Sequence, residues 1–264
     1  MAELPGKKMF SMKTVCIVIG ASRGIGRSIV VNFASKFPTG SLVVALARDS
    51  EQLAVTKTLS TQASPGVGCV TRVFDQGSLD QHQYDTWLQD CLRGKTASEF
   101  QQAVIIHNAA TIGSEFCENL TEVNQVSQYL NINVAGLVAV NARFMQEFRD
   151  VPSKVVVNIT SGSALQPRAS WGLYGSGKAF RDMFMRTLAL EHPDFRVLNY
   201  APGPVDTDMF HSSLQKTKDE NVLEAIRDMK KRVLTPDTTV NRLIAILEKN
   251  VFESGAHIDY FDDQ

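Results

Sequence analysis

Short apolar runs alternate with amphipathic stretches along almost the whole chain. Residues 14–19 (TVCIVI) are continuously apolar and rich in β-branched side chains, which is typical of a strand buried on both faces of a parallel sheet. Residues 27–37 (RSIVVNFASKF), which follow closely, have apolar positions at helical spacing. The same alternation predicts further strands at 41–49, 67–75, 101–111, 154–161, from 195 to about 201, and within 255–264. It predicts further helices at 51–64, 78–92, 121–148, from about 171 to 192, and 238–250.

This order of elements indicates a fold class. Strands that alternate with helices throughout predict a single doubly wound α/β domain covering residues 1–264, with a mainly parallel seven-stranded sheet and helices on both faces.

A glycine-rich turn joins the first strand to the first helix. Its sequence is GASRGIG: Gly20, Ala21, Ser22, Arg23, Gly24, Ile25 and Gly26. Glycines at such a turn let the backbone approach a pyrophosphate, which then lies at the positive end of the helix. The spacing differs from G-x-G-x-x-G, and a tight turn without a ligand is the alternative.

Charged residues after the second and third strands suit the adenosine end of a dinucleotide. Arg48, together with Arg23, has the chemistry to bind a 2′-phosphate, which favours NADP(H) over NAD(H). Asp49 is the kind of residue that binds the 2′-hydroxyl of NAD instead, and both arginines are alternatively solvated surface charges. Asp75 is a candidate acceptor for the adenine amino group, or alternatively a cap of the next helix.

Tyr174 and Lys178 form the most informative pair. They are four residues apart in a predicted helix, so their side chains project from one face. An ammonium group beside a phenol lowers the phenol's pKa, which suits a general acid that donates a proton to a carbonyl oxygen. Ser161, at the end of the fifth strand, is placed to hold the same oxygen. A solvated tyrosine and lysine on a helix surface are the alternative.

Two further features follow from residue type alone. Asn131 and Asn133 lie inside a predicted helix, where asparagine is unfavourable, which suggests a kink or a water site. Pro202-Gly203-Pro204 breaks the sixth strand, and the polar residues 212–231 beyond it are typical of a mobile lid.

Composition gives no support to a nucleic-acid-binding, membrane-bound, secreted or metal-binding protein. The 264 residues carry a net charge of −1, with 44% hydrophobic and 21% charged residues, so charge gives no reason to expect a nucleic acid or a membrane surface as partner. The N-terminal residues lack the apolar run of a secretory signal. The four cysteines are scattered without metal-binding spacing, which favours reduced thiols in a cytoplasmic protein and no metal site.

Together, GASRGIG, Asn108-Ala109-Ala110, Ser161, the Y-x-x-x-K pair and the proline-glycine break resemble the short-chain dehydrogenase/reductase family over essentially the whole chain. The resemblance implies a Rossmann-type fold and an NADP(H)-dependent oxidoreductase. It implies that Tyr174 is the proton donor, that Lys178 also anchors the nicotinamide ribose, and that Ser161 with Gly162 binds substrate. It assigns to Asn133 a water for proton relay. It assigns to the cofactor the turn Gly20–Gly26 and Arg48, Asp49, Asp75, Gln76, Asn108, Val205, Asp206, Thr207, Asp208, Met209 and Phe210.

Within the family, the resemblance is greatest to reductases of pterin side chains. The segments that carry it are 163–167 (SALQP), 188–209 (LALEHPDFRVLNYAPGPVDTDM) and 254–263 (SGAHIDYFDD). This implies that Gly203 lines the substrate pocket, that Asp259 binds the guanidine-like edge of a pterin, and that residues from about 205 to 232 form a substrate lid. It also implies a homodimer through helices 121–148 and 174–190.

The chain departs from the family pattern at three places. Ile19 replaces a threonine, His107-Asn108-Ala109-Ala110 replaces N-N-A-G, and Gln76 replaces a commoner apolar residue. Two other functions are compatible with the motifs: a broad carbonyl or steroid reductase, and a non-catalytic NADP-binding sensor.

Overall fold

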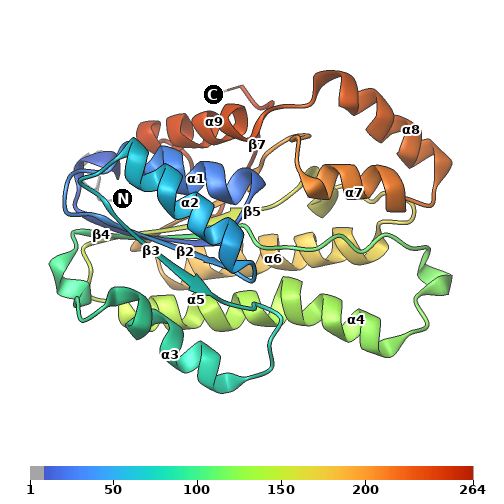
Figure 1. The fold of residues 1–264 in the computed structure, drawn as a ribbon. Coiled ribbons are helices and arrows are strands. Elements are labelled where there is room, and N and C mark those ends of the chain that lie inside the picture. Colours follow the sequence, from blue (N-terminus) through green and yellow to red (C-terminus); the bar gives the residue numbers. More distant parts are fainter. Residues whose placement is uncertain (1–8, 264) are drawn as a thin grey trace.

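A sheet of parallel strands forms the centre of the fold. In the computed structural model, which describes residues 9–263, seven strands are paired in the order β3-β2-β1-β4-β5-β6-β7 (Figure 1). Each neighbouring pair is parallel, so the predicted doubly wound α/β class is confirmed. The strands are β1 (Thr14–Ile19), β2 (Leu42–Ala47), β3 (Gly68–Val73), β4 (Gln102–His107), β5 (Ser153–Ile159), β6 (Phe195–Ala201) and β7 (His257–Asp259).

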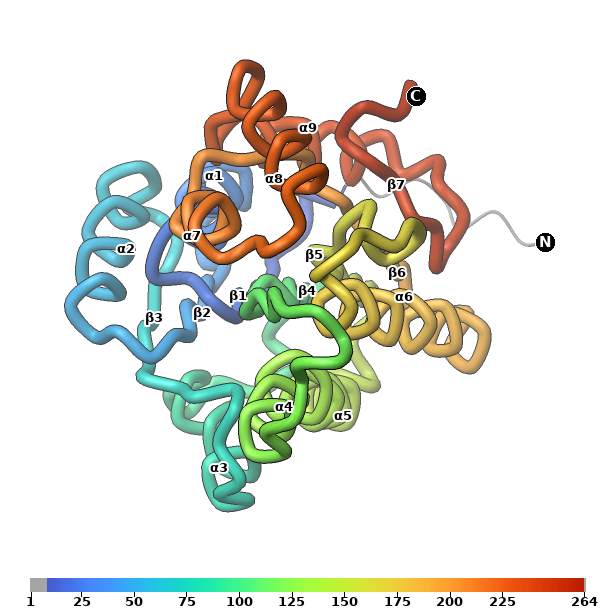
Figure 2. The backbone as a smooth tube through the Cα atoms, turned by 90° about the vertical axis from the view of Figure 1, so that its right-hand side faces the viewer, coloured from blue at the N-terminus to red at the C-terminus, as the bar shows by residue number. Residues whose placement is uncertain are grey.

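Helices cover both faces of this sheet. Helices α1, α2 and α9 lie on one face and α3, α5 and α6 on the other, with α4 continuing into α5 (Figures 1 and 2). The bounds are α1 (Gly24–Ala34), α2 (Ser50–Ala63), α3 (Gln81–Leu92), α4 (Val123–Leu130), α5 (Gly136–Glu147), α6 (Gly172–Glu191), α7 (Asp208–Lys216), α8 (Glu220–Met229) and α9 (Pro236–Lys249). Short 3-10 turns cover Met9–Ser11, Ala97–Glu99, Cys117–Asn119, Gly162–Ala164 and Lys230–Arg232.

The apolar runs become strands because both of their faces are buried. Along β1, Cys16 and Val18 pack in the core under α1 and α9, whereas Val15, Ile17 and Ile19 pack in the core under α3, α5 and α6. Successive strand side chains point to opposite faces, so a continuously apolar run supplies both cores at once.

Side-chain caps begin several helices. Asp49 Oδ1 accepts a hydrogen bond from Gln52 N at the start of α2, and Asp80 Oδ1 accepts from His82 N at the start of α3. The alternative in which Asp75 caps the helix after β3 is therefore wrong. Asp75 lies before that helix, and its Oδ1 accepts from Gly77 N in the preceding turn.

The helix predicted over 121–148 is interrupted. A π-helical segment, Asn131–Ala135, separates α4 from α5. This wider helical segment contains both Asn131 and Asn133, at the place where the sequence predicted an irregular helix. It brings Gly136 against the backbone of Gln76, where an added Cβ would lie only 1.8 Å from the Gln76 carbonyl oxygen.

The segment predicted as a mobile lid is folded into helices α7 and α8. Leu223 and Ile226 are buried on the inner side of α8, while the charged residues of that helix face outwards. This amphipathic pattern accounts for the high polar content noticed in the sequence. Over residues 9–263, no helix is both long enough and apolar enough to cross a bilayer.

Candidate functional site

A cleft of about 1580 Å³ lies at the carboxyl ends of the strands and is bordered by α7. It brings together residues from both ends of the sequence, including Gly20, Tyr174 and Asp259. Every residue predicted for the site lines this cleft, except Ala21, Gly26 and Asn133. Parallel α/β sheets bind ligands at this edge because the loops after the strands converge there.

The glycine-rich turn has a backbone that only glycine adopts readily. Gly20 and Gly24 have φ values of +83° and +53°. A Cβ at Gly26 would lie 2.1 Å from the Gly20 carbonyl oxygen, so this residue permits close packing of α1 on the turn without lining the cleft. The start of α1 has no side-chain cap hydrogen bond. The residues therefore fit a dinucleotide whose pyrophosphate accepts from these amides.

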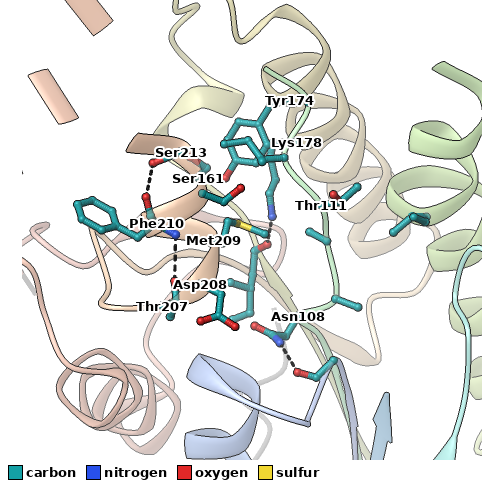
Figure 3. A pocket seen from close by; sticks show the side chains of 18 of the residues that line it. Asn108, Thr111, Ser161, Tyr174, Lys178, Thr207, Asp208, Met209, Phe210 and Ser213 are labelled. Atoms are coloured by element: carbon teal, nitrogen blue, oxygen red, sulfur yellow. Dashed lines mark hydrogen bonds between the residues drawn. The ribbon is translucent and has the colours of Figure 1, made fainter. Parts of the chain in front are cut away.

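Asn108 joins this turn to the end of β4. Its Nδ2 donates to the Gly20 carbonyl oxygen over 2.9 Å (Figure 3). The side chain therefore supports the turn from behind, and Ala109 and Ala110 leave the cleft open beside it.

Arg48 and Arg23, the two basic residues predicted to bind the adenosine part of the cofactor, have different surroundings. Arg48 is exposed and lines the cleft. Arg23 Nη1 forms an ion pair of 2.6 Å with Asp208 Oδ2, which links the glycine turn to α7. Asp49 lines the cleft, but its carboxylate also caps α2. This second duty of Asp49 weakens it as a partner for a ribose hydroxyl.

Asp75 and Gln76 line the cleft after β3. Gln76 is buried, and its Nε2 donates to Ile132 O over 2.5 Å at the π-helical segment. Tyr84 donates from its hydroxyl to the Gln76 carbonyl oxygen over 2.6 Å. These two hydrogen bonds therefore hold the loop after β3 against the π-helical segment and α3.

Ser161, Tyr174 and Lys178 converge in the centre of the cleft (Figure 3). Tyr174 and Lys178 extend from one face of α6 and are buried, whereas Ser161 follows β5. Lys178 Nζ donates to Ile159 O over 2.7 Å and lies 5.8 Å from the centre of the Tyr174 ring. The Trp171 ring contacts Tyr174 edge-on, with centroids 5.3 Å apart.

The electrostatics of this group differ from the prediction. Burial raises the pKa of Tyr174, and the opposing influences are the hydrogen bond from Ser161 and the charges of Arg181 and Arg168. Burial, followed by the charge of Arg181, lowers the pKa of Lys178 well below its usual value. Lys178 is not among the groups that lower the pKa of Tyr174, and the net direction of that pKa is upwards because burial dominates.

Asn133 lies behind the cleft. Its side chain is buried and hydrogen-bonded at both ends, because Oδ1 accepts from Thr111 N over 2.9 Å and Nδ2 donates to Tyr129 O over 2.9 Å. The amide thus fixes the loop after β4 against the π-helical segment.

The other side of the cleft comes from the C-terminal part of the chain. Gly203 has a φ of +70°, and Asp259 ends β7 with its Oδ1 accepting from Phe261 N over 3.0 Å. The turn from Val205 to Phe210 begins α7, where Thr207 Oγ1 accepts from Phe210 N (Figure 3).

Sequence reasoning missed three residues near this site. Arg181 and Asp182 are buried in α6 beneath Lys178, and Trp171 packs on Tyr174. Two adjacent charges within the otherwise apolar stretch 179–185 (AFRDMFM) were the available signal. Buried charges need partners, and those partners come from other strands and are not visible in the sequence.

The chain belongs to the short-chain dehydrogenase family, and it is therefore an oxidoreductase of a family that uses nicotinamide cofactors. The family model described as short chain dehydrogenase matches residues 14–218. The mouse protein named sepiapterin reductase is 35% identical over 255 residues, covering 94% of this chain and 97% of the relative. The bovine protein of the same name is 34% identical, covering 95% and 96%.

Solved structures agree in fold. A short chain dehydrogenase from Shigella flexneri 2a str. 301, complexed with NADP, superimposes with a TM-score of 0.80 at 21% identity, covering 97% of this chain and 100% of that one. The relatives therefore match this chain from end to end.

Proposed function

We propose that this oxidoreductase reduces the side-chain ketone of a pterin, of the sepiapterin or 6-pyruvoyl-tetrahydropterin type, with NADPH in tetrahydrobiopterin biosynthesis. The names of the mammalian relatives support this substrate. The observation that carries the proposal is that Asp259 lines the same cleft as Ser161 and Tyr174. A carboxylate suits the guanidine-like edge of a pterin, which offers paired donors.

The reaction follows from the three central side chains. The nicotinamide, when bound, supplies a hydride to the carbonyl carbon. Ser161 donates a hydrogen bond to the carbonyl oxygen, and Tyr174 transfers its phenolic proton to that oxygen as the alcohol forms. Burial favours the protonated phenol, as a proton donor requires. Lys178 holds the nicotinamide ribose, and Asn133 supports the water that returns the proton.

Other residues are assigned to binding. The turn Gly20–Gly26 holds the pyrophosphate, Asp75 and Gln76 flank the adenine, and Asn108 lies at the neighbouring ribose. Arg48, with Arg23 released from Asp208, binds the 2′-phosphate and favours NADPH. Gly162 and Gly203 line the pterin pocket. The segment of Val205, Asp206, Thr207, Asp208, Met209 and Phe210 closes over the cofactor as the start of a lid at about 205–232.

A homodimer completes the proposal. Helix α6 presents Phe180, Met183 and Leu190 to solvent, with exposed fractions of 41%, 62% and 82%. These positions share one face of the helix, and an apolar stripe of this kind suits the helix-to-helix contact implied by the resemblance. The chain is proposed to act as one domain in the cytoplasm, without a nucleic-acid or membrane partner.

The decisive experiment compares two substrates in two variants. Asp259→Asn keeps the size of the side chain and the Oδ1 acceptor but removes the charge. We expect it to lower kcat/KM for sepiapterin by about 30-fold or more, which corresponds to the loss of charged hydrogen bonds worth about 2 kcal/mol. It should change kcat/KM for a small diketone little. The matched control is Asp263→Asn, which removes a carboxylate from the same tail at an exposed position.

The alternatives give different results. Equal losses on both substrates would contradict the assigned role of Asp259. Faster turnover of non-pterin ketones than of sepiapterin in the unmodified protein would indicate a broad carbonyl reductase. NADPH binding without oxidation over the whole panel of ketones would indicate a sensor.

A further inference from the structure

Arg181 shares a helix face with Tyr174 and Lys178. The three residues stand at positions i, i+4 and i+7 of α6, so their side chains leave the helix on one side. Arg181 is 1% exposed, the most buried of the three. It lies deeper beneath the cleft than the catalytic pair and does not line it.

Each nitrogen of its guanidinium group donates to a neutral oxygen atom. Nε donates to Asn158 Oδ1 over 2.8 Å, Nη1 to Ala109 O over 3.1 Å, and Nη2 to His107 O over 2.6 Å. Two of these acceptors belong to the end of β4 and the loop after it, beside Asn108 and the glycine turn. Arg181 therefore fastens the catalytic helix to the part of the sheet that supports the proposed cofactor site.

The charge of Arg181 has no carboxylate neutralising it by direct contact. Within residues 9–263, no ion pair involves Arg181. The adjacent Asp182 directs its carboxylate elsewhere, to Thr160, Asn158 and His257. A guanidinium group keeps its proton far more firmly than an ammonium group when it is buried. Burial lowers the pKa of Arg181 only to about 10, so the group stays charged at neutral pH.

Tyr174 is surrounded by few other ionisable groups. Those that face it or Arg181 are Tyr129 from α4, Lys178 and Asp182 from α6, Arg168 from the loop before α6, and His107 from β4. Burial and then Arg181 lower the pKa of His107 to about 3, and burial raises the pKa of Tyr129. Both are uncharged at neutral pH, and burial lowers the pKa of Lys178, which favours its neutral amine. Arg181 and Arg168 are thus the cations that oppose the rise in the pKa of Tyr174, and Arg181 is the one that is buried and held by backbone oxygen atoms.

We propose that Arg181 is a positioning residue of the reductase, which fixes α6 against the end of β4 and supplies the permanent positive charge that stabilises the Tyr174 phenolate left after proton transfer. This role rests on Tyr174 being the proton donor but not on the identity of the ketone.

The test titrates the phenol directly. The near-ultraviolet absorbance of phenolate is followed against pH in the unmodified protein and in Tyr174→Phe, and the difference isolates Tyr174 from the other tyrosines. The same difference is measured in the Arg181→Gln background and in the Arg181→Lys background. Circular dichroism at each pH confirms that the compared proteins are folded. No substrate is needed, so a wrong ketone cannot affect the result.

Arg181→Gln removes the charge and should raise the pH at which Tyr174 is half deprotonated by about one pH unit, because a nearby positive charge favours the phenolate. Arg181→Lys, which loses hydrogen bonds but keeps a cation, should move it much less. Unchanged titrations in both variants, or equal shifts in both, would overturn the proposal, since a purely structural role predicts no difference between them. If Arg181→Gln does not fold, Asn158→Asp replaces it. This isosteric change places a carboxylate against Arg181 Nε and should also raise the pH at which Tyr174 loses its proton. If that pH is unchanged, the proposal is overturned.

Discussion

At the scale of single residues, the centre of the cleft combines a buried phenol with a serine hydroxyl. Ser161 and Tyr174 are both fixed by neighbours, Ser161 through Ser163 N and Tyr174 through the edge of Trp171. Fixed geometry is what makes proton donation efficient, since the donor does not have to be reoriented during the reaction.

Tyr174→Phe removes the phenolic proton but keeps the ring against Trp171. We expect kcat for ketone reduction to fall by about 10²–10⁴-fold, the usual contribution of a general acid. NADPH affinity, measured by fluorescence titration, should change little. Retention of most of the turnover by this variant would exclude Tyr174 as the proton donor.

Arg48→Ala removes the exposed cation of the cleft. We expect KM for NADPH to rise about 10-fold and KM for NADH to stay the same, because only NADPH carries the 2′-phosphate that an arginine binds by charged hydrogen bonds. Lys57→Ala is the matched control, since it removes a positive charge from the exposed surface of α2. An equal rise in KM for both cofactors would show that Arg48 does not bind the 2′-phosphate.

At the scale of elements, a buried pair joins α6 to β7. Asp182 Oδ2 lies 2.5 Å from His257 Nδ1, and their side chains are only 4% and 8% exposed. The same carboxylate accepts from Asn158 of β5 and from Thr160 just beyond it. One aspartate therefore joins α6 to two strands, including the strand that ends in Asp259.

Asp182→Ala leaves the Thr160 hydroxyl and the Asn158 amide without this acceptor in a buried site. We expect the free energy of unfolding to fall by about 3 kcal/mol, the cost of breaking a buried polar pair by removing one partner. Urea denaturation measures it. Asp228→Ala is the control: its carboxylate is exposed and pairs with Lys231, so its loss should change the free energy of unfolding little. Similar losses in the two variants would contradict the buried role.

Most elements could be predicted because their signals are local. The apolar run 14–19 coincides with β1, and the asparagines at 131 and 133 mark the π-helical segment. The glycine turn and the Tyr174–Lys178 pair were likewise visible from spacing. The partners of Arg181, the ion pair between Arg23 and Asp208, and the dominance of burial at Tyr174 depend on contacts between distant segments. No pattern within one element contains that information.

At the scale of the whole molecule, the sheet separates two buried apolar cores, and the outer face of α6 carries a row of exposed apolar residues. Phe180 and Phe184 stack in parallel on α6, with ring centroids 6.1 Å apart, next to the exposed Met183. Isolated exposed apolar residues are ordinary, but a row of them along one long helix is typical of a subunit contact.

Met183→Glu places a charge in the centre of that row. If the row is the dimer contact, we expect the variant to sediment or elute as a monomer at concentrations where the unmodified protein is a dimer. Light scattering after size-exclusion chromatography measures the mass. Leu79→Glu, at a position 81% exposed and outside α6, is the matched control and should leave the mass unchanged. An unmodified protein that is monomeric would itself contradict the homodimer.

The position of β7 has a consequence for how such an enzyme diversifies. This strand is the last to be added, at the edge of the sheet, and pairs with β6 over only three residues, Asn199 to Ala201. The residues proposed for proton transfer, Ser161, Tyr174 and Lys178, all precede it in the sequence. If Asp259 binds the substrate as proposed, exchanging the segment after β6 between homologues should change substrate choice and leave the proton-transfer residues in place, provided that His257 is retained as the partner of Asp182 in α6.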